Sequence, residues 1–244
     1  FRLRVGACCS PSTPWVGSYR VTFNVEPNSL PVTTTTVAVT TTTVAAAPCA
    51  TGGTCIVGDT GPGGGIVFYV ASGTFTQTGA SGSMCTTECK YLEAAPANWL
   101  SGTTGDPRRT WAIMTNENSA SGANGTAIGS GYQNSLFIVA QTGNVAASSA
   151  AVLARSYSGG SKSDWFLPSK VELNELCKYA GTQTTGTTTT CDNTGRLRIG
   201  FSTDDYWSSS EYSVHGAWSQ YFSYGFQYDD TKYLTLYVRP VRAF

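Results

Sequence analysis

The chain has 244 residues, and its 15 basic and 15 acidic side chains cancel to zero net charge. Only 12% of the residues are charged, whereas a nucleic-acid-binding protein needs a basic surface to displace counterions from phosphates, so this composition excludes a nucleic-acid partner. No apolar run approaches the ~20 residues of a membrane helix, so we expect no direct membrane insertion. Because the chain opens at Phe1 rather than at a methionine, we expect a fragment or a processed product.

The first two segments are short and compositionally distinct. Residues 17–25, GSYRVTFNV, alternate apolar and polar side chains, which predicts a half-buried antiparallel strand. One strand cannot bury a core alone, so residues 1–30 are interpreted as the C-terminal remnant of a β-sandwich-like domain. Residues 31–48, PVTTTTVAVTTTTVAAAP, predict an extended extracellular Thr/Ala-rich linker. An edge strand is the alternative, since threonine and valine favour β structure.

Residues 49–244 are predicted to form one α+β domain. GDTGPGGGIVFYV at 58–70 is a glycine-rich turn that leads into a buried strand at 66–70. A phosphate-binding loop would need a helix N-terminus after the glycines, and a strand follows instead. Further short strands are expected at 90–94 and 111–114.

Helical spacing follows in the middle of the domain. Tyr132, Leu136 and Val139 or Ala140 recur at helical spacing, and a second helix is expected at roughly 146–155.

A third helix has a stronger start signal. Ser169 and Glu172 form a capping box, in which each side chain satisfies a free backbone amide. Short strands are expected from there to the C-terminus, so the domain combines two to three helices with short antiparallel strands. The predicted buried stripe of the third helix is Leu173, Leu176, Cys177 and Ala180.

Eight cysteines fall in closely spaced pairs, which predicts local disulfides and an oxidising, extracellular or cell-surface location. Buried free thiols and a zinc site are the alternatives. Zinc is disfavoured because His215 is the only histidine and Cys85 and Cys89 lack a second nearby ligand pair. The expected disulfides are Cys49–Cys55, Cys85–Cys89 and Cys177–Cys191.

Four motifs then resemble a known family: GDTGPGGGIVFYV, SDWFLPSKVELNEL at 163–176, YWSSSEY at 206–212 and VRPVRAF at 238–244. Together they are similar to the C-terminal domain of the Legionella collagen-like adhesin and to the variable proteins that retroelements diversify. The resemblance covers about residues 56–244. It implies a C-type-lectin-like fold, related in shape to the formylglycine-generating enzyme, and a ligand-binding domain without catalysis.

In diversified members of this family, adenine-directed mutagenesis rewrites the segment before VRPVRAF, so the resemblance implies a variable region at about 206–244. Scrambling the adenines of the codon AAC cannot yield Met, Trp, Gln, Lys or Glu. Positions carrying these types are therefore interpreted as a fixed frame. In 206–244 they are Trp207, Glu211, Trp218, Gln220, Gln227 and Lys232.

Strand periodicity then divides the variable region. In AWSQYFSYG, Trp218, Gln220 and Phe222 share one face, while Ser219, Tyr221 and Ser223 share the other. We expect Leu234, Leu236 and Val238 to be core, with the tyrosines between them exposed to ligand. The tyrosine-rich composition matches that of antibody paratopes, although tyrosines at sheet spacing could instead be core. The predicted ligand-binding residues are Ser213, Val214, His215, Ser219, Tyr221, Tyr224, Phe226, Tyr228, Asp229, Asp230, Tyr233, Thr235 and Tyr237.

Catalytic signatures are weak in this chain. His215 is the only possible base for a nucleophile triad, and no cysteine lies in the C-terminal segment. Asp204 and Asp205 could offer oxygens to calcium, but no EF-hand pattern surrounds them. We therefore expect no enzyme activity, no cofactor and no metal. Arg239 and Arg242 are predicted to be structural, bonded to carbonyls or to an acid such as Glu211.

The predicted function is a receptor or adhesin at the cell surface or on a virion, with a protein as the preferred ligand and a glycan as the alternative. A fixed-specificity adhesin for glycan or matrix is the second hypothesis, and a formylglycine-type enzyme is the third.

Overall fold

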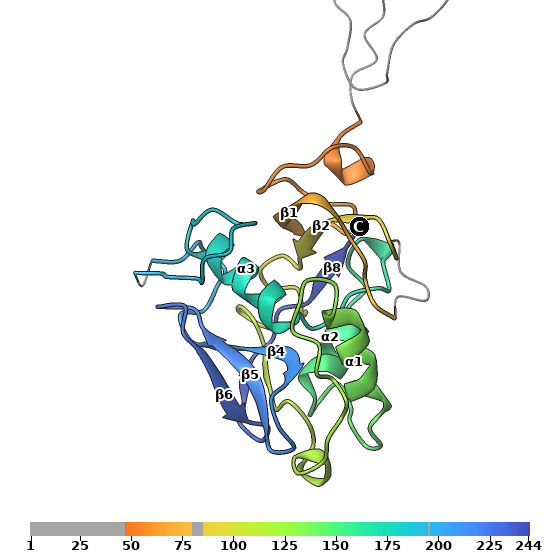
Figure 1. The fold of residues 1–244 in the computed structure, drawn as a ribbon, viewed down its shortest axis with the longest axis vertical. Coiled ribbons are helices and arrows are strands. Elements are labelled where there is room, and N and C mark those ends of the chain that lie inside the picture. The colour runs from red at the N-terminus through yellow and green to blue at the C-terminus, as the bar shows by residue number, and fades with distance from the viewer. Residues whose placement is uncertain (1–46, 80–84, 195) are drawn as a thin grey trace, which may run out of the picture. The chain divides into compact units, whose positions relative to one another are not determined.

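The structure, a computed structural model, describes residues 47–79, 85–194 and 196–244 (Figure 1). All of these residues belong to one unit, Val44–Phe244. The predicted β-sandwich remnant at 1–30 and nearly all of the linker at 31–48 lie outside the described residues, as do Cys8 and Cys9.

A small antiparallel sheet joins the two ends of this unit. It contains β1 (Ile66–Phe75), β2 (Cys89–Ala94) and β8 (Val241–Ala243), in the order β1-β2-β8. The C-terminal strand therefore pairs with a strand formed some 150 residues earlier, with Leu92 opposite Ala243. The final motif of the chain closes the fold, and the strands predicted at 66–70 and 90–94 are confirmed.

A second sheet of five strands carries the C-terminal segment. Its pairs are antiparallel, except that β4 and β7 run parallel. The strand at one edge of this sheet is β6, the outermost strand at the lower left of Figure 1. In spatial order the strands are β3 (Arg108–Arg109), β7 (Leu236–Tyr237), β4 (Asp205–Glu211), β5 (Gly216–Tyr221) and β6 (Gln227–Thr231).

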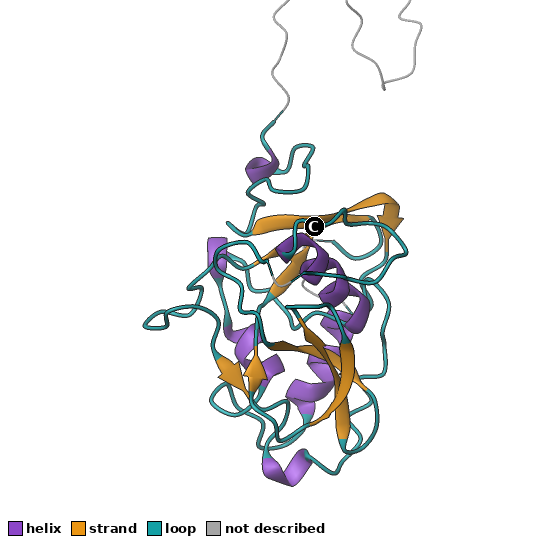
Figure 2. Ribbon diagram, turned by 90° about the vertical axis from the view of Figure 1, so that its left-hand side faces the viewer, coloured by secondary structure: helices purple, strands orange, loops and turns teal. Residues whose placement is uncertain are grey.

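Three α-helices lie beside the sheets, with short 3-10 turns between other elements (Figure 2). The mixed α+β class predicted from the sequence is confirmed. The α-helices are α1 (Gly131–Ala140), α2 (Ala150–Ser156) and α3 (Lys170–Ala180), and the 3-10 turns are Cys49–Thr51, Met114–Asn116 and Gly159–Ser161.

Helix α3 begins at the predicted capping box. The Ser169 hydroxyl accepts from the Glu172 amide at 3.3 Å, and the Glu172 carboxylate accepts from the Ser169 amide at 2.7 Å. The predicted stripe is also confirmed, because Leu173, Leu176, Cys177 and Ala180 are all buried.

Two core clusters occupy opposite faces of the five-stranded sheet. Tyr206 and Trp207 are neighbours in β4, so their side chains point to opposite faces. Tyr206 belongs to the cluster that contains Phe68 and Leu176, whereas Trp207 belongs to the cluster that contains Trp111. The sheet is thus covered on both faces near its centre, and free surface is confined to its edges and turns.

The disulfide predictions are confirmed among the described cysteines. The bonded pairs are Cys49–Cys55, Cys85–Cys89 and Cys177–Cys191. Within the described part of the chain, no helix combines the length and apolar character that crossing a membrane requires.

Two expectations about the middle of the domain are wrong, and a third, the helix expected at roughly 146–155, is confirmed with a later start. Residues 111–114 form no strand: 111–112 are a bend and Met114 begins a 3-10 turn, while the buried Trp111 indole donates to the Ser208 carbonyl at 2.8 Å. The α1 stripe passes through Ile138 rather than Val139 or Ala140, which are exposed. Helix α2 begins at Ala150, a few residues later than predicted.

Candidate ligand-binding surface

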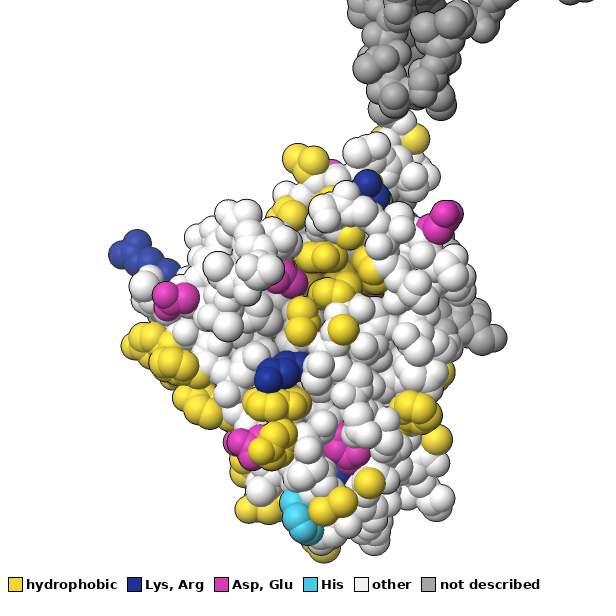
Figure 3. Space-filling model, viewed as in Figure 1, with side chains coloured by type: hydrophobic (Ala, Val, Ile, Leu, Met, Phe, Trp, Pro, Cys, Tyr) yellow, Lys and Arg dark blue, Asp and Glu magenta, His cyan; other side chains and the backbone are white. Residues whose placement is uncertain are grey.

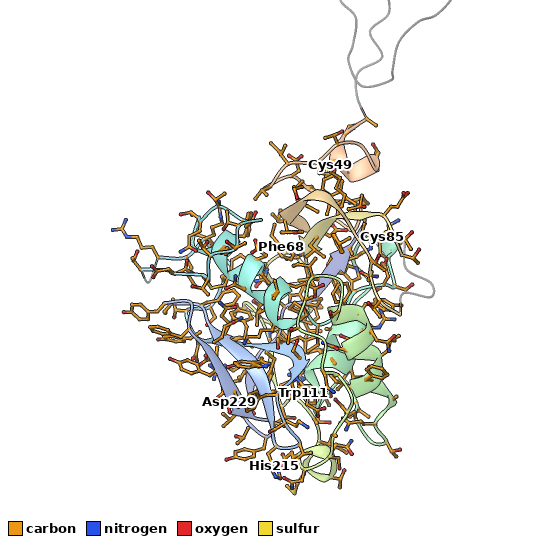
Figure 4. All side chains as sticks on the ribbon, viewed as in Figure 1. Cys49, Phe68, Cys85, Trp111, His215 and Asp229 are labelled. Carbon is orange, nitrogen blue, oxygen red and sulfur yellow. A yellow bond between two sulfur atoms is a disulfide. The ribbon has the colours of Figure 1, made fainter. Side chains whose placement is uncertain are left out.

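The predicted site residues lie on the β5–β6 hairpin and the turns around it. The turn from β4 into β5 exposes Ser213, Val214 and His215. The Ser213 hydroxyl accepts from the amides of His215 and Gly216, which fixes the turn. His215, at the bottom of Figure 4, contacts the Asn118 side chain at 2.7 Å through its Nδ1.

A buried ion pair holds this turn from below. The Lys232 ammonium is fully buried, 2.5 Å from the Glu211 carboxylate and 2.9 Å from the carbonyls of Ser119 and Val214. Glu211 also accepts from the amides of Ser121 and Gly122. Because every polar atom of the pair has a partner, the turn is anchored to the loop at 119–122.

Two glutamine side chains fix the hairpin to helix α3. Gln220 donates to the Asn174 side chain at 3.1 Å and to the Gly225 carbonyl at 3.0 Å. Gln227 donates to the Lys170 carbonyl and to the Gln220 side chain. Together with Lys232 and Glu211, these are positions that the sequence assigned to a fixed frame, and the structure places them inside or against the body of the domain.

Four aromatic rings follow one another along the outer end of the hairpin. We call Tyr221, Tyr224, Phe226 and Tyr228 the aromatic run. Successive ring centroids are 5.9, 6.4 and 6.3 Å apart. The last three side chains are 53%, 58% and 47% exposed, and hydrophobic side chains gather at this edge in Figure 3.

The expected division of faces is wrong for the two serines. Ser219 is buried and donates to the Asp230 carboxylate at 2.5 Å, and Ser223 is buried and donates to the Thr203 carbonyl at 2.6 Å. Ser219 lies opposite Trp207, on the face that the core cluster containing Trp111 covers. Ser223 follows β5 in a turn that packs on the Thr203 carbonyl. Ser219 therefore supports the surface from beneath.

The last predicted strand is shorter than expected. Residues 232–234 form a turn, so Tyr233, Leu234 and the following Thr235 are all exposed and the expectation that Leu234 is core is wrong. Tyr237 is half-buried in β7, with its ring 5.4 Å from that of Tyr206 and under the Arg108 guanidinium. The structure thus does not bring Tyr237 into the aromatic run.

Carboxylates lie beside the aromatic run. Asp229 is exposed on β6 (Figure 4), and Asp230 is partly exposed next to it. Burial, together with the negative charges of Asp230 and Asp204, raises the pKa of Asp205 to about 6. Asp204 forms an ion pair with Arg108.

The two C-terminal arginines are structural, as predicted, but with other partners than Glu211. Arg239 binds Asp106 and the Ala95 carbonyl, and Arg242 binds the Glu93 and Asp164 carboxylates. Burial raises the pKa of Glu93. These bonds tie the final strand to loops far away in sequence.

One part of the surface was missed from the sequence. A groove of about 400 Å³ separates the loop at 190–192 from the turn between β5 and β6. Gly225 forms its floor with a φ of +82°, where a Cβ atom would lie 2.0 Å from the Cys191 carbonyl oxygen. The predicted disulfide to Cys177 linked Cys191 to helix α3, but no pattern in the sequence predicted that the loop at 190–192 lies against the hairpin. The groove is lined by Thr190, Cys191, Asp192, Tyr224, Gly225, Phe226 and Gln227.

No group of three or more His, Cys, Asp or Glu side chains among the described residues is arranged to hold a metal ion. The β5–β6 hairpin offers exposed aromatic rings, carboxylates and backbone groups on a rigid support, and these groups are suited to binding a ligand.

Comparison with protein families finds a match over the C-terminal part of the chain. The family model of the Lcl C-terminal domain matches residues 139–242. This range includes helices α2 and α3, strands β4 to β7 and the whole β5–β6 hairpin. No curated protein matches the chain.

Proposed function

We propose that the chain is a ligand-binding, adhesin-like protein of the cell surface, and that the β5–β6 hairpin with its flanking turns is the binding site. The observation that carries this proposal is the aromatic run, in which three neighbouring rings are about half exposed on a hairpin held by buried polar bonds. Exposed aromatic clusters on rigid supports are common at protein recognition sites. The match to the Lcl C-terminal domain and the three disulfides support a surface location.

The fold is proposed to be C-type-lectin-like, and the hairpin to be a region that a retroelement diversifies. The support is the partition of residue types: all six positions whose residues the codon AAC cannot yield are buried or partly buried. Neighbouring DNA tests this part. A near-copy of the 206–244 coding region that differs at adenines, beside a reverse transcriptase gene, is the expected finding, and its absence would leave a fixed-specificity adhesin.

The binding site is tested by substitution. A variant with Tyr224→Ser, Phe226→Ser and Tyr228→Ser should lose binding to peptides selected on the wild-type domain from a random display library. The matched control replaces three exposed apolar residues elsewhere, Met114, Val145 and Ile199, with serine. Equal binding by both variants would contradict the proposed site.

Glycan binding is the alternative within the same site. The wild-type domain and the two serine variants would be applied to an array of glycans. Binding to glycans that the aromatic variant loses, without selection of any peptide, would favour a glycan or matrix adhesin.

A further inference from the structure

The hairpin has a backbone feature that its side chains do not reveal. Strand β6 pairs with β5 on one side, and no strand among the described residues pairs with its other side. Such an edge offers amides and carbonyls that a further extended strand can bind.

The register shows which groups point outward. Residue pairs in an antiparallel ladder alternate between bonded and non-bonded. The Tyr221 amide donates to the Phe226 carbonyl, and the Lys232 amide donates to the His215 carbonyl. Tyr221 with Phe226 and His215 with Lys232 are thus hydrogen-bonded pairs of the ladder. Counting inward from them, the pairs without mutual hydrogen bonds are Gln227 with Gln220, Asp229 with Trp218, and Thr231 with Gly216.

It follows that Gln227, Asp229 and Thr231 direct their backbone groups away from β5. Leu234 donates to the Thr231 carbonyl and thereby uses that acceptor. The remaining groups are the amides of all three residues and the carbonyls of Gln227 and Asp229. They lie at the regular spacing of a strand, which is what an extended partner needs.

Carboxylates predominate around this edge. The segment 212–231 contains no lysine or arginine, but it contains Asp229 and Asp230. Asp205 lies near Asp230, and Asp192 lines the groove into which the β6 edge leads past Gln227. Three cations of neighbouring segments are already engaged: Lys232 with Glu211, Arg108 with Asp204, and Lys170 over the Trp218 ring at 3.1 Å.

The carboxylates beside β6 favour one kind of added strand over another. A second copy of this chain pairing through β6 would bring its own Asp229 and Asp230 against these, and like charges facing each other across strands are destabilising. A strand with lysine or arginine side chains gains from the same carboxylates, and its cations can also lie over the exposed tyrosine rings.

We propose that the ligand is an extended, basic polypeptide segment, which adds to the sheet as a strand beside β6 and continues into the groove at 190–192. The aromatic run would contact its side chains while the β6 backbone binds its main chain. This inference rests on the proposed function, since it names the class of ligand for the same hairpin.

The test uses three synthetic peptides and the intact chain. The first alternates lysine with threonine and valine, the second has glutamate in place of lysine, and the third is the basic peptide with N-methyl groups on its central residues. Binding is measured by fluorescence anisotropy at low and high salt.

The basic peptide should bind and the acidic one should not. N-methylation should weaken binding on the order of 30-fold, since it removes about two backbone hydrogen bonds of ~1 kcal/mol each. Asp229→Asn should weaken binding of the basic peptide roughly two- to fivefold, as expected for one exposed charge pair.

Amide hydrogen exchange gives an independent readout. Binding should slow exchange at Gln227, Asp229 and Thr231, while Tyr228 and Asp230, already bonded to β5, change little. Equal binding of the methylated and unmethylated basic peptides would overturn strand addition, and preference for the acidic peptide or self-association through β6 would overturn the basic partner.

The two proposals can fail separately. If no peptide of this set binds but the aromatic variant still loses the ligands selected on the wild-type domain, the binding site stands and the strand-addition inference fails. If the aromatic variant keeps those ligands, the proposed site itself fails.

Discussion

Replacing Lys232 with methionine tests whether a buried frame holds the binding surface. The ammonium lies 2.5 Å from Glu211, and bonds to two carbonyls complete its coordination. Methionine keeps most of the side-chain volume but leaves the Glu211 carboxylate buried without its cation. Breaking a buried pair in this way costs about 3–5 kcal/mol of unfolding free energy, which for a domain of this size lowers the melting temperature by about 10 °C.

The assay is urea unfolding followed by tryptophan fluorescence, since Trp111 lies beneath Lys232 with its ring centre 4.9 Å from the ammonium. A double-mutant cycle isolates the pair. Because Glu211→Gln removes the unpaired charge, the double variant should be more stable than the sum of single effects predicts, by about 2 kcal/mol. Lys162→Met, at a partly exposed lysine, is the control.

A loss under about 1 kcal/mol for Lys232→Met would refute the reasoning, because that is the range of exposed ion pairs. A fully additive cycle would equally contradict a direct Lys232–Glu211 interaction. The 212–215 turn should also become more susceptible to proteolysis in the single variant, since Lys232 holds the Val214 carbonyl.

Two further predictions concern pH and covalent bonds. Burial raises the pKa of Glu172 from 4.5 to about 7, although hydrogen bonds from backbone amides partly offset this effect. Between about pH 4.5 and 7, Glu172 is therefore protonated in the folded state and ionised in the unfolded state. Stability should therefore rise as pH falls through this window, by about 3 kcal/mol from this group, and Glu172→Gln should flatten the dependence measured by urea unfolding at several pH values. A stability that rises with pH in the wild-type domain would contradict this sign. Replacing Cys177 and Cys191 together with alanine opens a loop with a sequence separation of 14 and should cost about 3 kcal/mol, seen as a lower urea midpoint. Replacing Cys85 and Cys89, whose sequence separation is 4, should cost less, about 2 kcal/mol. A larger loss for the Cys85/Cys89 variant than for the Cys177/Cys191 variant would contradict the loop-length argument.

Much of the local structure follows from short-range patterns. The capping box of α3 requires only Ser169 and Glu172 at the correct spacing, and the disulfides join cysteines that are close in sequence. Such features depend on neighbouring residues alone, so a sequence specifies them. The distinction between Lys232 and the tyrosines near it likewise came from residue type, and the burial of the Lys232 ammonium agrees with it.

Long-range contacts determined which predicted surface and core residues are exposed. Ser219 has the composition and spacing of a surface position, yet it is buried because it lies beside Trp207 on a face that a core cluster covers. Leu234 has the composition of a core position, yet it is exposed because the chain turns there instead of continuing as a strand. Alternation along a strand indicates two faces, but which face is covered depends on partners far away in sequence.

The sequence by itself therefore determined the class of the fold, the disulfides, the caps and the segment in which the candidate surface lies. Only the tertiary structure determined that β6 is an open edge, that its outward backbone groups belong to Gln227, Asp229 and Thr231, and that the loop at 190–192 meets the hairpin in a groove. The physical reason is that strand order and loop contacts are long-range: they are set by how two core clusters pack on opposite faces of one sheet.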